Sequence, residues 1–290
     1  MWIIAINPIS GQGRGATMGT KVAGYCATKG IDYEIVTGVS AQSLALALKE
    51  KIARDKVLIE GIIAVGGDGL AHLILQSAVP ANIPVAFIPG GPGNDLVRTL
   101  GWSLDEITAY LQRVFETKPV NVDLGLVDGE WFAAVLSSGF DAVVNERANV
   151  LKWPKGPMRY NAAIALELPK FKPAHYEIEL DDRTISTQAM LIAIGNGSSY
   201  GGGMKVCPNA NLRDGLFDVM VLKPISIPEF IRVFPKVYSG KHVHHPEVEI
   251  YRSKRVRIEA DTVAYADGER IGQLPISAEC VTGALSTWMP

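Results

Sequence analysis

Short apolar runs alternate with longer amphipathic stretches along the first 120 residues of the chain. Buried strands are predicted at 3–6, 33–36, 62–65 and 85–88. Helices are predicted at 17–29, 41–53, 70–78, 95–100 and 104–115. Ser103 is the expected N-cap of the last helix. Strands that alternate with helices in this way predict a parallel sheet covered by helices on both faces.

After about residue 122 the pattern changes to strands in which apolar and polar positions alternate. Strands are predicted at 131–136, 176–180, 184–188, 190–195, 218–222, 248–251, 256–259 and 263–266. A helix is predicted at 159–168, and turns at 181–182 and 267–268. We therefore expect an α/β domain at 1–120 and a β-rich antiparallel sandwich at 121–290, with the last residues able to return to the first domain.

Composition restricts the class of protein only broadly. The 290 residues are 48% hydrophobic and 20% charged, which is typical of a globular protein, and the net charge of −2 gives no general field for nucleic acid. Three scattered cysteines indicate free thiols in a reducing compartment. The chain lacks the features of a signal peptide and any apolar run close to 18 residues. A cytoplasmic location is expected.

Two glycine-rich loops, each directly after a predicted strand, carry the most specific chemical signal. They are Gly-Gly-Asp-Gly at 66–69 and Pro-Gly-Gly-Pro-Gly-Asn-Asp at 89–95. A glycine loop between a strand and a helix presents backbone N–H groups to phosphate. The acid Asp68 inside the first loop points to a metal ion at the same place. One phosphate-rich ligand held by both loops is the simplest interpretation.

Other segments are ambiguous when taken alone. The loop at 7–16 contains Gly-x-Gly-x-x-Ala but is also compatible with a tight structural turn. The loop at 196–218 could hold a hard cation or form a surface turn. Asp267-Gly268-Glu269 has the pattern of a solvated type I′ turn. The histidines at 242–245 lack a suitably spaced partner for zinc.

Taken in order, these motifs resemble the catalytic family of the diacylglycerol kinases in its bacterial soluble form, which is related to the sphingosine kinases. The resemblance rests on Asn-Pro-x-Ser-Gly, Gly-Gly-Asp-Gly, Gly-x-Gly-Asn-Asp, Gly-Phe-Asp-Ala, the stretch from Gly-Gly-Gly-Met-Lys to Asp-Gly-Leu-x-Asp, and a late Asp-Gly-Glu. They lie at 7–11, 66–69, 91–95, 139–142, 201–218 and 267–269. This order across both domains implies a nucleotide-binding first domain and a lipid-substrate second domain, with the site in the cleft.

The resemblance also implies roles for individual residues. Asp267 would be the general base on a lipid hydroxyl, with Glu269 assisting through magnesium and Asp68 at the same site. ATP would be contacted by Asn7, Ser10, Gly11, Thr37, Gly66, Gly67, Asp68, Gly69, Gly91, Gly93, Asn94 and Asp95. A structural Mg²⁺ would be held by Asp214 with oxygens near Asn211 and Leu216. A positioned carboxylate suits this reaction, because an alcohol must lose its proton as the new P–O bond forms.

The chain departs from the family pattern where hydroxyls are expected to face phosphate. Leu70 and Pro92 stand where the family usually has threonine, and Leu73 stands where it commonly has glutamate. The expected function is phosphate transfer from ATP to diacylglycerol or a similar lipid. The alternatives are a non-catalytic relative that binds lipid or nucleotide, and an NAD kinase, which shares the Gly-Gly-Asp-Gly loop.

The expected partners are a lipid substrate and the inner face of the membrane, which the protein would contact peripherally. The sequence is compatible with a homodimer but does not fix the oligomeric state. The segment 152–160 mixes basic and aromatic residues, so it is a candidate for membrane contact and equally for a solvated loop.

Overall fold

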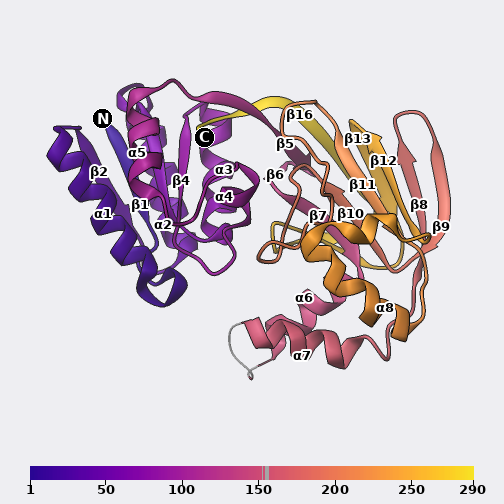
Figure 1. Ribbon diagram of the computed structural model, residues 1–290. Coiled ribbons are helices and arrows are strands. Elements are labelled where there is room, and N and C mark those ends of the chain that lie inside the picture. Colours follow the sequence, from indigo (N-terminus) through magenta and orange to yellow (C-terminus); the bar gives the residue numbers. More distant parts are fainter. Residues whose placement is uncertain (152, 154–156) are drawn as a thin grey trace.

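The computed structural model describes residues 1–151, 153 and 157–290. It consists of an α/β domain and a β-rich domain that lie side by side (Figure 1). The free cysteines Cys26, Cys207 and Cys280 are buried. The predicted fold class, a parallel sheet with helices followed by an antiparallel sandwich, is confirmed.

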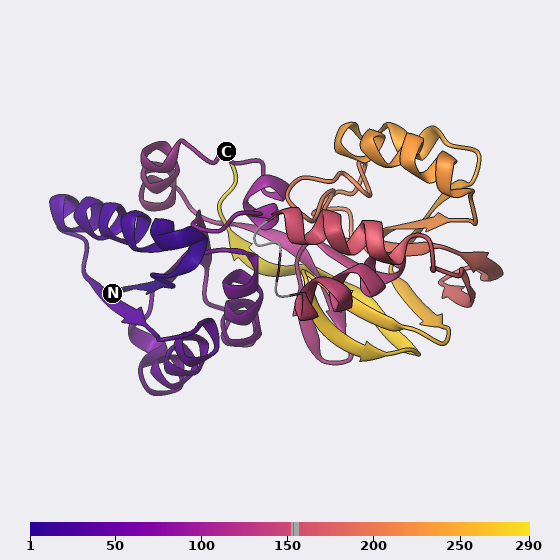
Figure 2. The same ribbon diagram turned by 90° about the horizontal axis from the view of Figure 1, so that it is seen from below.

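The first domain is a parallel sheet in the order β2–β1–β3–β4. Its strands are β1 (Trp2–Ile6), β2 (Tyr33–Thr37), β3 (Gly61–Gly66) and β4 (Val85–Pro89). Its helices are α1 (Arg14–Lys29), α2 (Ala41–Asp55), α3 (Asp68–Ala81), α4 (Asp95–Thr99) and α5 (Ile107–Glu116). Helices α2 and α3 cover one face, and α1 and α5 the other (Figure 2). β1, β3 and β4 are buried on both faces, which is why they read as continuous apolar runs.

The second domain packs two antiparallel sheets face to face around a shared apolar core. One sheet has the order β12–β11–β10–β7–β14–β15, and the other β6–β5–β16–β13–β8–β9. The strands are β5 (Val120–Val127), β6 (Glu130–Phe132), β7 (Val135–Gly139), β8 (Ala174–Leu180), β9 (Thr184–Ala189), β10 (Leu191–Gly195), β11 (Phe217–Leu222), β12 (Val248–Ser253), β13 (Arg255–Glu259), β14 (Val263–Ala266), β15 (Glu269–Gln273) and β16 (Ile276–Thr287).

Helices α6 (Phe140–Val150), α7 (Pro157–Glu167) and α8 (Ile227–Val233) cover the outer face of the sheet that contains β7, β10 and β11. Short 3-10 helices follow β1, α2 and α8 at Ser10–Gly13, Lys56–Leu58, Phe234–Ser239 and Lys241–His244. A separate apolar cluster forms beneath α6, α7 and α8.

Strands β5 and β16 pair with each other and join the two domains. Val120 at the start of β5 lies opposite Thr287 at the end of β16. Beyond this point the chain enters the core of the first domain, where the Trp288 ring lies against Trp2 and the Thr287 hydroxyl donates to the carbonyl of Val85 at 2.7 Å. The end of the second domain is thus anchored in the first.

Several local predictions need correction. Helix α5 begins at Ile107, not at 104, so Ser103 does not cap it; its hydroxyl instead accepts from the backbone N–H of Asp105. The strand predicted at 131–136 is split into β6 and β7, because the N–H groups of Ala133 and Ala134 bind a distant carboxylate, that of Asp267. Helices α6 and α8 and strands β5, β15 and β16 were not predicted.

Candidate active site in the cleft between the domains

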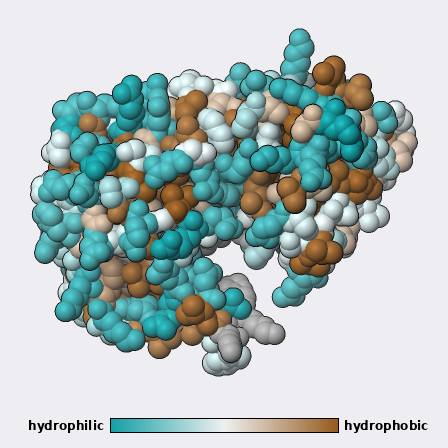
Figure 3. Space-filling model, turned by 180° about the vertical axis from the view of Figure 1, so that it is seen from behind, coloured by the Kyte–Doolittle hydropathy of each residue, from teal (hydrophilic) through white to brown (hydrophobic). Residues whose placement is uncertain are grey.

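A cavity of about 1010 Å³ runs from the glycine loops of the first domain into the second domain. Gly11, Asp68 and Gly91 line it on one side, and Phe230 and Val237 line its far end. From behind, the surface is hollowed between the two domains (Figure 3). The cavity therefore joins a polar, glycine-rich region to an apolar chamber.

The loops after β1, β3 and β4 meet at the carboxyl edge of the parallel sheet, because those strands are neighbours. The N–H of Gly90 donates to the carbonyl of Gly66 at 2.7 Å. A Cβ on Gly91 would lie 2.5 Å from the Cα of Gly67, and one on Gly11 would lie 2.2 Å from the oxygen of Gly90. Only glycine permits this close packing of the three loops.

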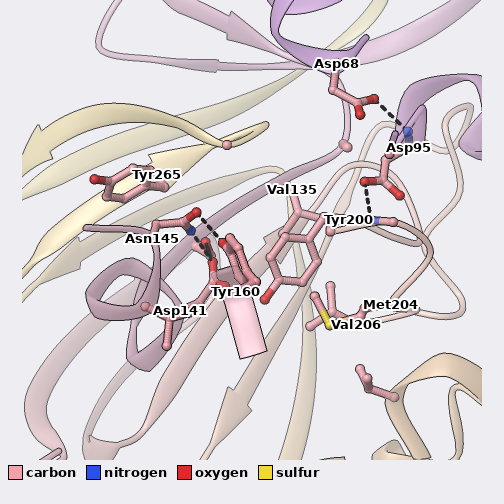
Figure 4. A pocket seen from close by; sticks show the side chains of 18 of the residues that line it. Asp68, Asp95, Val135, Asp141, Asn145, Tyr160, Tyr200, Met204, Val206 and Tyr265 are labelled. Carbon is pink, nitrogen blue, oxygen red and sulfur yellow. Dashed lines mark hydrogen bonds between the residues drawn. The ribbon is translucent and has the colours of Figure 1, made fainter. Parts of the chain in front are cut away.

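Asp68 and Asp95 connect these loops to the rest of the cleft. Asp68 begins α3, and its Oδ1 accepts from the N–H groups of Asp95 at 2.6 Å and Leu96 at 3.4 Å, so it caps α4. Burial, reinforced by the nearby charge of Asp95, raises the pKa of Asp68 to about 6. The Asp95 carboxylate accepts from Gly202 and Gly203, both at 2.8 Å, and thereby holds a loop of the second domain (Figure 4).

Asp267 lies in the turn between β14 and β15, and its side chain points into the protein rather than into solvent. The residue has φ 51° and Gly268 has φ 88°, as a type I′ turn requires. The Asp267 side chain is 8% exposed, so this carboxylate is not solvated as the pattern suggests, although Gly268 and Glu269 are exposed. Its oxygens accept from the N–H groups at the break between β6 and β7: Ala133 at 2.8 Å, Ala134 at 2.8 Å and Val135 at 3.3 Å.

His72, which sequence reasoning did not single out, lies next to this carboxylate. Its Nδ1 is 3.5 Å from Oδ2 of Asp267, and its Nε2 is 2.8 Å from Oε1 of Glu130. Burial opposes a charge on the ring, but the two carboxylates outweigh it and raise the pKa of His72 to about 9. Helical spacing was the available signal, since His72 follows Asp68 by one turn of α3.

A buried polar cluster interrupts the apolar wall of the cavity. Asp141 on α6 accepts from the Ser137 hydroxyl at 2.6 Å and from the Asn145 amide at 3.3 Å. The Tyr160 hydroxyl donates to Oδ1 of Asn145 (Figure 4), and Tyr200 lies close enough to Asp141 to influence its pKa. Burial raises the pKa of Asp141. These residues were not predicted individually, although Asp141 lies in the Gly-Phe-Asp-Ala motif.

The structure brings most, but not all, of the predicted site residues into this cleft. The cavity wall includes Gly11, Asp68, Gly91, Gly93, Asp95 and Asp267. Asn7, Ser10, Gly66, Gly67, Gly69 and Asn94 belong to the same three loops. Glu269 begins β15, and a Cβ on Gly69 would lie 3.2 Å from its Oε1. Thr37 ends β2, which β1 separates from β3 and its loop.

The predicted magnesium ligands lie apart from the cavity, in the loop before β11. Asp214 forms an ion pair with Arg252, and its Oδ1 accepts from Leu216 N–H at 3.1 Å. The side-chain oxygen of Asn211 accepts from Arg213 N–H at 3.1 Å. Among the described residues, no group of three or more His, Cys, Asp and Glu could hold a metal ion. Because Arg252 already neutralises Asp214, this donor set does not fit a cation well, and the assignment stays a prediction.

The two positions at which the expected threonine is replaced, 70 and 92, have different surroundings. The Leu70 side chain is 2% exposed and packs in the core of the first domain, where a Cβ on Gly66 would touch it. Pro92 is exposed and lines the cavity. Of the two missing hydroxyls, the one at position 92 is therefore the one that a ligand in the cleft would contact.

Comparison with known proteins agrees with this geometry. Residues 1–127 match the diacylglycerol kinase catalytic domain, and residues 134–289 match the YegS C-terminal NAD kinase beta sandwich-like domain. A Mycobacterium tuberculosis protein called diacylglycerol kinase is 33% identical, over 98% of this chain and 93% of its own length. The chain belongs to the diacylglycerol kinase family.

Two further proteins described as diacylglycerol kinases are similar to this chain in sequence or in fold. A Bacillus subtilis diacylglycerol kinase is 31% identical over 79% of this chain and 76% of its own length. A solved Bacillus anthracis structure described as a diacylglycerol kinase shares the fold, with a TM-score of 0.75, 22% identity and coverage of 100% of this chain and 96% of that one. Within the described residues, no helix has both the length and the apolar character needed to cross a bilayer. Family membership supports a kinase of the lipid-kinase type.

Proposed function

We propose that this protein transfers the γ-phosphate of ATP to the hydroxyl of diacylglycerol or a similar lipid, with Mg²⁺. One observation carries the proposal: a single cavity joins the glycine loops of the first domain to the apolar chamber of the second. An acceptor lipid needs that combination, because its hydroxyl must meet phosphate while its acyl chains leave water. Asp267 lines the cavity where the two regions meet.

The residues of the glycine loops fit a nucleotide phosphate group. A Cβ on Gly93 would lie 2.5 Å from Oδ2 of Asp68, so the glycine keeps space open beside that carboxylate. Gly67 and Gly91 pack backbone against backbone, so neither position places a side chain in the way of a ligand. ATP and Mg²⁺ would supply the phosphoryl group and offset its charge when bound. We assign the phosphates to the loops at 66–69 and 90–95, and Mg²⁺ to the neighbourhood of Glu269.

In this proposal, the chain itself positions the acceptor and takes up its proton. Asp267 would accept the proton of the lipid hydroxyl, because it is a carboxylate fixed on the cavity wall. The apolar chamber would hold the acyl chains between α6, α7 and α8 and exclude water from the reaction. Alignment and charge neutralisation then supply most of the rate enhancement, as in phosphoryl transfer generally.

We expect the lipid to be taken from the inner face of a membrane. Tyr160 and Ile164 on α7 line the cavity, and Met158 on the first turn of the same helix is 66% exposed. Trp153, just before α7, is 79% exposed. Of the basic and aromatic segment 152–160, residues 152 and 154–156 lie outside the described residues. The exposed apolar side chains beside a cavity wall are consistent with contact at a lipid surface.

Transfer of labelled phosphate from ATP to a panel of lipids, with mass detection of the products, tests the function. Wild-type protein should phosphorylate at least one lipid with a free hydroxyl, and Asp267→Asn should lower kcat by about 10²–10⁴-fold, as expected for loss of a general base. Asp128→Asn, at an exposed turn after β5, is a matched control that should retain full activity. No transfer to any lipid, or full activity in Asp267→Asn, would refute the proposal.

One observation favours a non-catalytic lipid- or nucleotide-binding protein instead. Pro92 offers neither a hydroxyl nor an N–H to phosphate at the wall of the cavity. Calorimetry distinguishes this alternative, since it predicts lipid binding without measurable ATP binding. Phosphate transfer to NAD in the same assay would instead indicate an NAD kinase.

A further inference from the structure

We propose that His72 is a positioning residue of this site, and that its ring, anchored by Glu130, holds the Asp267 carboxylate fixed at the wall of the cleft. The inference deepens the proposed function and rests on it, since Asp267 matters to catalysis only if the cleft transfers phosphate. The pairing of His72 with Asp267 can nevertheless be measured without any activity.

The position of His72 follows from the geometry of α3. The helix begins at Asp68 in the first glycine loop, and residues one turn apart lie on the same face. Asp68, Ala71 and His72 accordingly all line the cavity. One helix face thus carries an acid that caps α4 and, one turn later, a ring that reaches the turn between β14 and β15.

The surroundings of the ring favour its charged form. His72 is 1% exposed and lies between Glu130 on β6 and Asp267 on the turn after β14, while its own helix contributes the more distant Asp68. An uncharged ring would leave a buried carboxylate beside it without a counter-charge, which is costly. The pKa of His72, about 9, agrees with a ring that is protonated at neutral pH.

The two acids depend on the ring to different degrees. The Glu130 side chain is 42% exposed and can be hydrated if the ring is lost. The Asp267 side chain is 8% exposed and is hydrogen-bonded to backbone N–H groups that prevent it from turning toward solvent. Removal of the ring therefore acts mainly on Asp267, the residue to which we assign proton transfer.

A purely structural role is the competing explanation, because the His72–Glu130 contact also ties α3 to β6. Gln76, one turn further along α3, already joins these elements through the carbonyl and the N–H of Trp131, at 2.7 and 2.8 Å. The contact between α3 and β6 therefore does not depend on His72 alone. A structural role would change stability alone, whereas a positioning role changes kcat and its pH dependence.

The first test is an NMR titration of histidine side chains in the free protein, which needs neither ATP nor lipid. We expect His72 to titrate well above an ordinary histidine, and Asp267→Asn and Glu130→Gln each to lower its midpoint. His175→Gln removes an exposed histidine that forms a comparable pair with Glu177 at 3.1 Å, so it should leave the His72 midpoint unchanged. A His72 midpoint at or below 6.5, or one insensitive to Asp267→Asn, would overturn the proposal.

The second test is steady-state kinetics of His72→Gln and His72→Phe. We expect kcat to fall by about 10²-fold in His72→Phe, the order of loss caused by a small misplacement of a reacting group. The KM for ATP should change by less than about twofold, because the glycine loops are untouched. Loss of the His72 proton should make wild-type kcat fall as pH rises through about 9, and this fall should be absent in His72→Phe. His72→Gln should retain part of kcat by hydrogen bonding without charge.

The outcomes separate the two proposals. Inactive wild-type protein with a His72 midpoint that responds to Asp267→Asn refutes the proposed function but supports the pairing. Active wild-type protein with unchanged kcat in His72→Phe refutes the positioning role. If His72→Phe does not fold, the His72→Gln kinetics and the titration decide the question.

Discussion

The buried acids of the cleft differ in what neutralises them. Asp68, Asp95 and Asp267 all accept from backbone N–H groups, and Asp267 in addition faces a histidine ring. Burial raises the pKa of Asp95 against the hydrogen bonds from Gly202 and Gly203. Outside the cleft, Arg252 neutralises Asp214. The partners of these acids therefore differ, and loss of a partner is expected to affect each acid differently.

At the residue scale, the His72 pair should make stability depend on pH. The folded-state pKa of His72, about 9, lies above the unfolded value of 6.5. The stabilisation is therefore fully present below about pH 6.5 and lost as pH rises through about 9. Urea denaturation of wild type and His72→Gln between pH 6 and 9.5 should show a stability difference that narrows with rising pH. A difference that is constant or grows would contradict the pair.

At the scale of elements, the short helix α4 depends on a side chain from the start of α3. Asp68 supplies the carboxylate that accepts from the first N–H groups of α4. The same side chain faces the cavity, so one residue both orders the second glycine loop and borders the proposed phosphate position. Local order of that loop is thus coupled to a residue 27 positions earlier in the chain.

Loss of this cap should be measurable. Asp68→Ala should lower the free energy of unfolding by about 1 kcal/mol, the usual cost of removing an N-cap acceptor, and should speed amide exchange at Asp95 and Leu96. Asp68→Asn retains an acceptor oxygen and should lose less. Asp105→Ala, at an exposed loop position, serves as the control for removal of an acid. Unchanged amide exchange at Asp95 and Leu96 in Asp68→Ala would show that α4 does not need this cap.

Sequence reasoning succeeded for elements whose signal is local and failed where distant groups decide. The buried runs of β1, β3 and β4 and the glycine loops after them were predicted because each is a short, continuous pattern.

The break between β6 and β7 was missed because Asp267, more than 130 residues away, accepts from the N–H groups at this break. Helix α6 was missed because Asp141 and Asn145 are buried among its apolar residues and interrupt the apolar pattern. His72 was missed because its partners are 58 and 195 positions away (130 − 72 and 267 − 72).

At the scale of the whole molecule, the two domains share a core residue. Trp288 follows the last strand of the second domain, is 3% exposed and packs against Trp2 in the first. Its carbonyl accepts from the Trp102 ring at 2.8 Å, and its own ring donates to the Thr117 carbonyl at 3.1 Å. The domains are therefore expected to unfold together.

Replacement of Trp288 should uncouple the unfolding of the two domains. Trp288→Ala should cost about 3–5 kcal/mol, as for other large aromatic side chains removed from a core, and should split a single calorimetric transition into two with the first domain melting earlier. Trp153→Ala changes a side chain that is 79% exposed and should leave the transition intact. A single unshifted transition in Trp288→Ala would show that the domains do not depend on this contact.

The pairing of Val120 with Thr287 gives the second domain the form of an inserted cassette. The chain leaves the first domain and returns to it on adjacent strands, which lie roughly 5 Å apart in any sheet. An insertion with such closely spaced ends disturbs its host little, and it can be exchanged without altering the geometry of the junction. The β-rich domain of another member of the family, grafted between these two positions, would meet the same glycine loops across the same cleft. Under the proposed function, acceptor preference would then change by exchange of one domain while the glycine loops are kept.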